Sequence, residues 1–211
     1  MNKKNFVLLI FCLFFIAIIT SACKDEKRIN PFANANVGDY VKMGNYPQTK
    51  DDDVKPIEWL VLAKEENKML VVSKYGLDTK RFDPHSNDWN SSEIHKWLNN
   101  QFYNQAFDET EKKNITRVFG DNVFLLTKEQ AEKYFANDYE RCCEATEYAV
   151  KQGALVSNGS LGGRAGYIWW WLSSASPNYH NVYTVLSAGN IDEFCPHNYN
   201  FVIRPALWIK L

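Results

Sequence analysis

The residue with the most clearly defined chemistry in this sequence is Cys23. It follows three small residues, 20–22, which end an apolar run over residues 6–19 that begins just after two lysines. This order is typical of a bacterial lipoprotein signal peptide over residues 1–22, after which the cysteine takes a diacylglycerol and further acyl chains such as palmitate. We therefore expect lipid on Cys23 to hold the chain on a membrane.

An uncleaved signal anchor is the alternative for this segment. The apolar run is shorter than the ~20 residues that span hydrocarbon, and it ends in small residues and a cysteine, which favours the lipoprotein. Thr20 departs from the pattern, because such signals more often carry leucine there. On the lipoprotein interpretation the folded part is extracytoplasmic, at the cell surface or on the periplasmic face of the cell envelope.

Three further cysteines, Cys142, Cys143 and Cys195, would share that compartment. A disulfide from Cys143, or from its neighbour Cys142, to Cys195 would close a loop of about fifty residues and contribute roughly 4 kcal/mol. The alternative is three unpaired thiols. The spacing matches no zinc site, because two of the cysteines are adjacent and no Cys-x-x-Cys pair occurs.

The other polar residues form no recognised catalytic pattern. Ser160 lacks the preceding glycine of a serine-hydrolase elbow, since Asn158 stands there. Cys195 and His197 are too close along the chain to indicate a catalytic pair. The acidic run 51–53 suits a solvated loop, because calcium needs further oxygen ligands at fixed spacing. We expect no catalytic residue, no metal site and no cofactor.

The composition indicates one globular domain without a strongly charged face. The 211 residues include 24 basic and 25 acidic side chains, a formal net charge of −1. No basic block occurs, so we expect no nucleic-acid partner. Aromatic side chains are numerous, with 7 Trp, 11 Tyr and 13 Phe, and such side chains either fill a core or line a binding face.

The run Trp169-Trp170-Trp171 is the most unusual feature of the folded part. Alternate residues of a strand face opposite sides, so Trp169 and Trp171 are expected to share one face and Trp170 to occupy the other. One interpretation is a central strand covered on both faces. The other is an exposed indole platform that binds a sugar ring or a peptide.

The chain divides into a polar tether over residues 23–36 and a single globular domain over residues 37–211. The domain is expected to open with strands over 40–43, 57–63 and 69–75, the last two joined as a hairpin by the polar residues 64–68.

Helices are expected in the middle of the chain. An apolar stripe from Ile94 to Ala106 has helical spacing, and Asn90 with Glu93 provides a capped start. Further helices are expected from Asp108 to Ile115, from the capping box that Thr127 forms with Gln130, and over 139–152, where Gly153 ends the helix. A strand over 118–126 is expected between the helix that ends at Ile115 and the helix that begins at Thr127.

Strands return after a glycine- and serine-rich loop over 154–166. They are expected over 167–172, 182–186, 191–194 and 201–211, with a turn at 188–190 and an edge position or a bulge at Arg204-Pro205. Strands, then helices, then strands indicate an α+β fold in which helices pack on an antiparallel sheet.

Five separated motifs occur in order along the domain: GNYPQT at 44–49, PIEW at 56–59, KWLNN at 96–100 with Phe102 and Ala106-Phe107 after it, WWWLSS at 169–174 and RPALWI at 204–209. Over residues 37–211 the chain thereby resembles the bacterial domain-of-unknown-function family numbered 6273. The resemblance implies an extracellular lipoprotein or surface protein with no established enzymatic activity.

The tryptophan-rich strand and the Arg-Pro-Ala-Leu closing strand also resemble the C-type-lectin-like fold of formylglycine-generating enzymes and retroelement-diversified binding proteins. This resemblance implies a ligand face on the loops between Trp171 and Phe201. These loops are rich in Tyr, Asn and Ser side chains, which suit adaptable recognition. Its candidate residues are Trp171, Ser176, Asn178, Tyr179, His180, Asn181, Asn190, Asp192, His197, Asn198 and Tyr199. The paired active-site cysteines of the enzymes and the calcium motifs of the lectins have no counterpart here.

The sequence therefore predicts a lipid-anchored, non-enzymatic binding module whose ligand is a carbohydrate, a peptide or a protein. One alternative is an enzyme, of the formylglycine-generating type or acting on the cell wall. Another is a structural lipoprotein of the envelope.

Overall fold

The computed structural model describes residues 30–178 and 180–211, apart from the side chain of Leu161. The chain divides into two units, residues 1–31 and Phe32–Leu211, and every element below belongs to the second. That unit begins at Phe32, whose ring is buried, before the expected start at Val37. The expected signal peptide, Cys23 and most of the expected tether lie outside the described residues.

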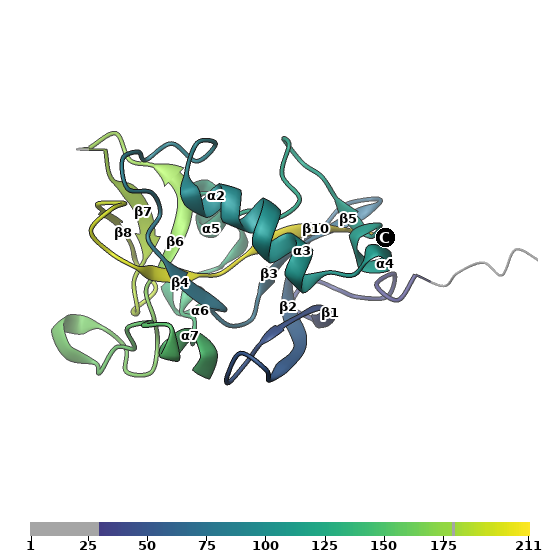
Figure 1. Ribbon diagram of the computed structural model, residues 1–211, viewed down its shortest axis with the longest axis horizontal. Helices are drawn as coiled ribbons and strands as arrows, with labels where there is room; N and C mark the ends of the chain where they lie inside the picture. The colour runs from purple at the N-terminus through teal and green to yellow at the C-terminus, as the bar shows by residue number, and fades with distance from the viewer. Residues whose placement is uncertain (1–29, 179) are drawn as a thin grey trace, which may run out of the picture. The chain divides into compact units, whose positions relative to one another are not determined.

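The first sheet has five antiparallel strands in the order β1-β2-β3-β10-β5 (Figure 1). The three expected opening strands are confirmed, and so is the hairpin between β2 and β3. The expected strand over 118–126 is wrong, because the chain there makes only isolated bridges to Asp121 and Ala206. The strands are β1 (Tyr40–Pro47), β2 (Val54–Lys64), β3 (Lys68–Ser73), β10 (Ala206–Lys210) and β5 (Ile115–Thr116).

The second sheet also has five strands, in the order β4-β9-β6-β7-β8. Only the pairing of β6 with β9 is parallel. The combination of helices with two mainly antiparallel sheets confirms the α+β class. The strands are β4 (Asp78–Lys80), β9 (Phe201–Ile203), β6 (Trp170–Ala175), β7 (Val182–Val185) and β8 (Ile191–Phe194).

The expected closing strand over 201–211 is divided between the two sheets. Figure 1 shows the yellow ribbon of β9 continuing into β10, and the two residues between them, Arg204 and Pro205, are buried. Proline has no N–H for a strand ladder, and here its carbonyl accepts from the Ser73 N–H at 2.8 Å. The prediction of an edge or a bulge was wrong, because these residues form a buried crossing from one sheet to the other.

The expected helical stripe is confirmed as three consecutive segments: α2 (Glu93–Trp97), a π-helical turn (Leu98–Phe102) and α3 (Tyr103–Ala106). The N-cap, however, is Ser92, whose hydroxyl accepts from the His95 N–H at 3.2 Å. The prediction of Asn90 was wrong because the buried Asp83 carboxylate, earlier in the same loop, accepts from the Glu93 N–H at 3.0 Å, so that the helix begins at Glu93.

The expected capping box of Thr127 with Gln130 is confirmed at the start of α5 (Lys128–Tyr134). The expected helix start after Asp108 is also confirmed, as α4 (Glu109–Lys112). The single helix expected over 139–152 is instead α6 (Asp138–Arg141) and α7 (Glu147–Lys151). Between them the backbone pairs with Gly76, which donates to Glu144 and accepts from Thr146, both at 2.9 Å. Gly153 has a φ of 105° after α7, as expected for a helix end.

The apolar side chains form two clusters, which meet opposite faces of β6. Trp171 is fully buried in one cluster and Trp170 in the other, while Trp169 packs at the edge of the Trp171 cluster. The expected alternation of the three indoles is therefore confirmed. Both faces of the strand are covered, and of the three rings only Trp169 is partly exposed.

Tyr46 gives the fold a pH dependence in alkali. Burial, with Asp78 beside it, raises the pKa of Tyr46 far above its usual value, and the hydroxyl donates to the Asp78 carboxylate at 2.8 Å. The unfolded tyrosine ionises near pH 10, so the free energy of unfolding is expected to fall as the pH rises above about 10. Denaturant unfolding below and above pH 10 should show a smaller fall in the free energy of unfolding for Tyr46→Phe than for the parent protein. An equal fall in the two proteins would contradict the role given to Tyr46.

Candidate functional site

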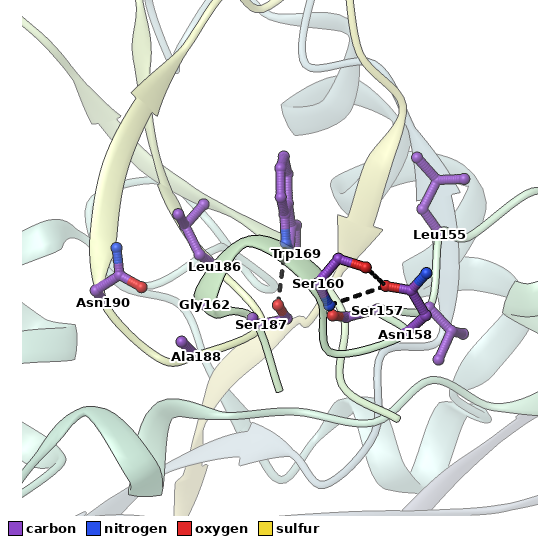
Figure 2. Close-up of a pocket in the computed structure, with 12 residues that line it drawn as sticks. Leu155, Ser157, Asn158, Ser160, Gly162, Trp169, Leu186, Ser187, Ala188 and Asn190 are labelled. Atoms are coloured by element: carbon purple, nitrogen blue, oxygen red, sulfur yellow. Dashed lines mark hydrogen bonds between the residues drawn. The ribbon is translucent and has the colours of Figure 1, made fainter. Parts of the chain in front are cut away.

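A pocket of about 460 Å³ lies beside Trp169 and is formed by the loop that precedes this residue and by the turn at 186–190. Figure 2 shows the indole between two walls, with Leu186 and Asn190 on one side and Ser160, Asn158 and Leu155 on the other. One wall is the loop after α7 and the other is the β7–β8 turn. The lining residues are Leu155, Val156, Ser157, Asn158, Ser160, Gly162, Gly163, Trp169, Leu186, Ser187, Ala188 and Asn190.

The β7–β8 turn is held in place by α6. Within the turn, Leu186 N–H donates to the Asn190 carbonyl and Gly189 N–H to the Leu186 carbonyl, both at 2.9 Å. Gly189 has a φ of 90°, and its carbonyl accepts from Arg141 Nε at 2.8 Å. The turn is therefore fixed both by its own hydrogen bonds and by a buried arginine.

The opposite wall is an ordered loop. Ser157 donates its N–H to the Tyr167 carbonyl at 2.8 Å, and its own carbonyl accepts from Gly166 at 2.9 Å. The Asn158 amide oxygen accepts from the Ser160 N–H at 3.0 Å and from the Ser160 hydroxyl. A Cβ at Gly163 would lie 2.7 Å from Ser187 Oγ, so the loop approaches the turn closely here.

The Trp169 indole is fixed between the walls by contacts on its inner side. Its ring centroid is 5.3 Å from those of Phe194 and Phe201. Its Nε1 donates to the Ser187 hydroxyl at 3.3 Å. The ring is thus a rigid, partly exposed apolar surface next to hydroxyl and amide groups.

The described side chains that line this pocket include no charged group. Its polar atoms are serine hydroxyls and the amides of Asn158 and Asn190. Leu155 and Val156 are exposed over 72% and 43% of their surfaces and add an apolar rim. Such a surface suits a neutral ligand that has both apolar faces and hydroxyl groups.

Most of the expected ligand face lies elsewhere. Trp171 is fully buried, with Nε1 bonded to the Lys80 carbonyl at 2.9 Å, so its expected place on a ligand face was wrong. Asn190 is the one described candidate that lines the Trp169 pocket, and Asp192 is exposed within β8. Tyr179 lies outside the described residues. The other candidates flank the far end of the β7–β8 hairpin: Ser176, Asn178, His180, Asn181, His197, Asn198 and Tyr199.

The three described cysteines are unpaired, so the structure contains no bond between Cys143 and Cys195. Cys143 is buried, which raises the pKa of its thiol, and its sulfur contacts the Lys74 carbonyl at 3.5 Å. Cys195 lies 3.3 and 3.2 Å from the two ring nitrogens of His197. These near-equal distances indicate packing against the ring rather than a bond directed at one nitrogen.

Sequence reasoning missed most of the pocket. The loop over 154–166 was expected only as a connection, and Ser157 and Asn158 carried no signal of their own. The alternation of the three indoles did not single out Trp169, because it places this ring on the same face as the buried Trp171. The loop and the turn meet only in the folded chain.

In the part of the chain that the structure describes, residues 30–178 and 180–211, no helix has the length and apolarity required to cross a membrane. The lipid anchor predicted at Cys23 concerns residues outside that part.

Comparison with known proteins identifies one family. Searches of curated proteins and of solved structures found no match. A family model described as a domain of unknown function, DUF6273, matches residues 66–123 and 116–211. The last three of the five motifs fall in the matched residues, and GNYPQT and PIEW precede them. The chain therefore belongs to the DUF6273 family.

Proposed function

We propose that this protein is a lipid-anchored, extracytoplasmic binding module that takes an uncharged carbohydrate into the Trp169 pocket. The observation that supports this most is the combination of a partly exposed indole with serine and asparagine side chains in a pocket whose described lining is uncharged. A sugar ring presents an apolar face of C–H groups and a hydroxyl periphery. The indole suits the first and the amides of Asn158 and Asn190 suit the second.

The neutral lining favours a carbohydrate over the other ligands that the sequence left open. A peptide or protein segment with charged side chains would leave those charges unpaired in this pocket, which weakens binding. An enzyme acting by acid–base chemistry needs a positioned titratable group, and the described lining side chains include none. The proposal is accordingly a non-enzymatic one, and the absence of charge supports it.

The anchor and the finer fold assignment belong to the same proposal. The signal pattern ending at Cys23 supports attachment through lipid. The tryptophan-rich strand and the Arg-Pro-Ala-Leu motif support a C-type-lectin-like fold, with the ligand at the β7–β8 turn instead of at the expected far end of that hairpin.

A glycan array tests the proposal directly. The full chain is purified in a detergent without a sugar headgroup and applied to neutral, acidic and peptidoglycan-derived glycans. We expect saturable binding to neutral glycans. Asn158→Ala and Asn190→Ala should each weaken it about tenfold, because each loses hydrogen bonds to the ligand worth about 1 kcal/mol or more.

Asn178→Ala is the matched control, because this exposed amide bonds Glu193 at 2.9 Å on the far end of the hairpin. It should bind as the parent does. Equal losses in all three variants would show that the pocket is not the site. No binding to any glycan would favour the structural lipoprotein, and release of a product from a bound glycan would contradict a non-enzymatic role.

A further inference from the structure

We propose that a second pocket, of about 440 Å³, binds the ammonium group of a lysine side chain presented by a partner protein. This pocket is independent of the Trp169 pocket. It is formed by the loop before α2, the segment from Val118 to Leu125 and the start of α5. The β2–β3 connection, the first residue of β3 and strand β10 also contribute. Its aromatic walls come from Trp89, Phe119, Phe124 and Trp208, and its carboxylates from Glu65 and Asp121.

The pocket already holds an ammonium group of the protein itself. Lys68 Nζ lies 4.4 Å from the centroid of the Trp208 ring and 3.3 Å from the Glu65 carboxylate. An indole face together with a carboxylate is the combination that recognises organic cations. Lys68 therefore shows, within the structure, which chemical group these walls accept.

A second carboxylate is fixed in the same pocket. Asp121 Oδ2 accepts from Trp89 Nε1 at 2.9 Å, and Oδ1 lies 2.7 Å from His95 Nε2. These two contacts orient the Asp121 carboxylate while it still lines the pocket. The charged side chains among the described lining are Glu65, Lys68 and Asp121, so the negative charge exceeds the positive and an incoming cation is favoured.

The turn above the pocket carries an aromatic ring where local structure disfavours one. Val118 and Asp121 exchange backbone hydrogen bonds at 2.9 and 3.0 Å around Phe119 and Gly120, whose φ values are 52° and 101°. Turns of this type favour asparagine or glycine, because other residues are strained at positive φ. The Phe119 side chain is nevertheless fully exposed.

An exposed ring on a strained turn indicates a contact that the chain itself does not supply. A lysine entering the pocket would lay its alkyl stem along Phe119 and Phe124 and place its ammonium between the indoles and Asp121. In this arrangement the ammonium gains a charged partner in Asp121, whereas a neutral ligand could at most donate an uncharged hydrogen bond to it.

The test is a titration of the full chain with Nα-acetyl-L-lysine N-methylamide, followed through the indole N–H resonances of Trp89 and Trp208. The matched probe is the same compound acetylated on Nε, which lacks the charge. We expect saturable shifts with the first probe only. Asp121→Asn should weaken binding about tenfold, because it removes a charged partner, whereas Asp192→Asn, an exposed carboxylate on β8, should have no effect.

Lys68→Gln separates the proposal from nonspecific attraction. Removing this cation frees the Trp208 face and Glu65, so binding should become about tenfold tighter. Nonspecific attraction of the probe to the protein's overall charge predicts no tenfold gain in affinity at the Trp89 and Trp208 resonances. Equal binding of the two probes, binding of choline but not of the lysine probe, or absence of shifts in both the parent and Lys68→Gln would each overturn the proposal. The Lys68→Gln result stands even if Asp121→Asn fails to fold.

Discussion

Replacing Arg204 with methionine is expected to lower the free energy of unfolding by about 3 kcal/mol. Arg204 is 3% exposed. Its Nε donates to the Ser73 carbonyl at 3.0 Å and a terminal nitrogen donates to the Arg141 carbonyl at 3.3 Å. The variant removes the Nε donor from the buried Ser73 carbonyl, which costs about 1–3 kcal/mol, and it also weakens the bonding of the Arg141 carbonyl, which keeps its bond from Trp170 Nε1 at 3.1 Å. Methionine keeps much of the apolar packing, so the loss would report chiefly on the hydrogen bonds.

The guanidinium also lies 5.0 Å from the Trp170 ring and 5.3 Å from the Phe135 ring. The measurement is urea unfolding followed by tryptophan fluorescence. Arg164→Met is the control, because Arg164 also lies over a ring, that of Tyr139 at 4.5 Å, but is exposed. It should change the free energy of unfolding by less than about 0.5 kcal/mol. Similar values for the two variants would contradict the structural role of Arg204.

The position of Arg204 gives the first residue of the RPALWI motif a structural role outside the Trp169 pocket. The residue follows β9 of one sheet, precedes β10 of the other, and bonds to the ends of β3 and α6. It therefore holds the crossing between the two sheets together.

Local signals predicted the elements whose ends are set by neighbouring residues. The start of α4 after Asp108, the capping box of α5 and the β2–β3 hairpin depend on side chains within a few positions of each other, and all three were found. The helix expected over 139–152 failed because Gly76, far away in the sequence, pairs with the backbone between Cys143 and Thr146. Such tertiary hydrogen bonds leave no periodic trace in the sequence.

The predicted ligand face combined residues from both ends of a hairpin whose strands were nearly right. Strands over 182–186 and 191–194, with a turn between them, place Asn190 at one end and residues 178–181 at the other. Grouping all of these residues in one ligand face was therefore inconsistent with the expected topology. The loop wall could not be predicted, because its approach to Ser187 depends on the packing of the whole second sheet.

Gly189→Ala is expected to lower the free energy of unfolding by more than about 4 kcal/mol, or to prevent folding, since backbone overlap cannot be relieved by a rotamer change. A Cβ at this position would lie 1.6 Å from the Asp138 carbonyl oxygen and 2.4 Å from its carbon. The backbone of α6 would have to separate from the β7–β8 turn, breaking the bond from Arg141 Nε to the Gly189 carbonyl. The same movement would remove one wall of the Trp169 pocket.

Gly166→Ala is the control that separates the energy of the steric overlap from the energy of placing alanine at positive φ. Its φ of 89° matches the 90° of Gly189, but a Cβ there would meet nothing within 4 Å. This variant should lose only the roughly 1–2 kcal/mol of placing alanine at positive φ. Urea unfolding of the pair therefore gives the overlap energy as a difference. If the two losses were equal, the close contact of α6 with the turn would be wrong, and the turn would not be a fixed wall against which a sugar could bind.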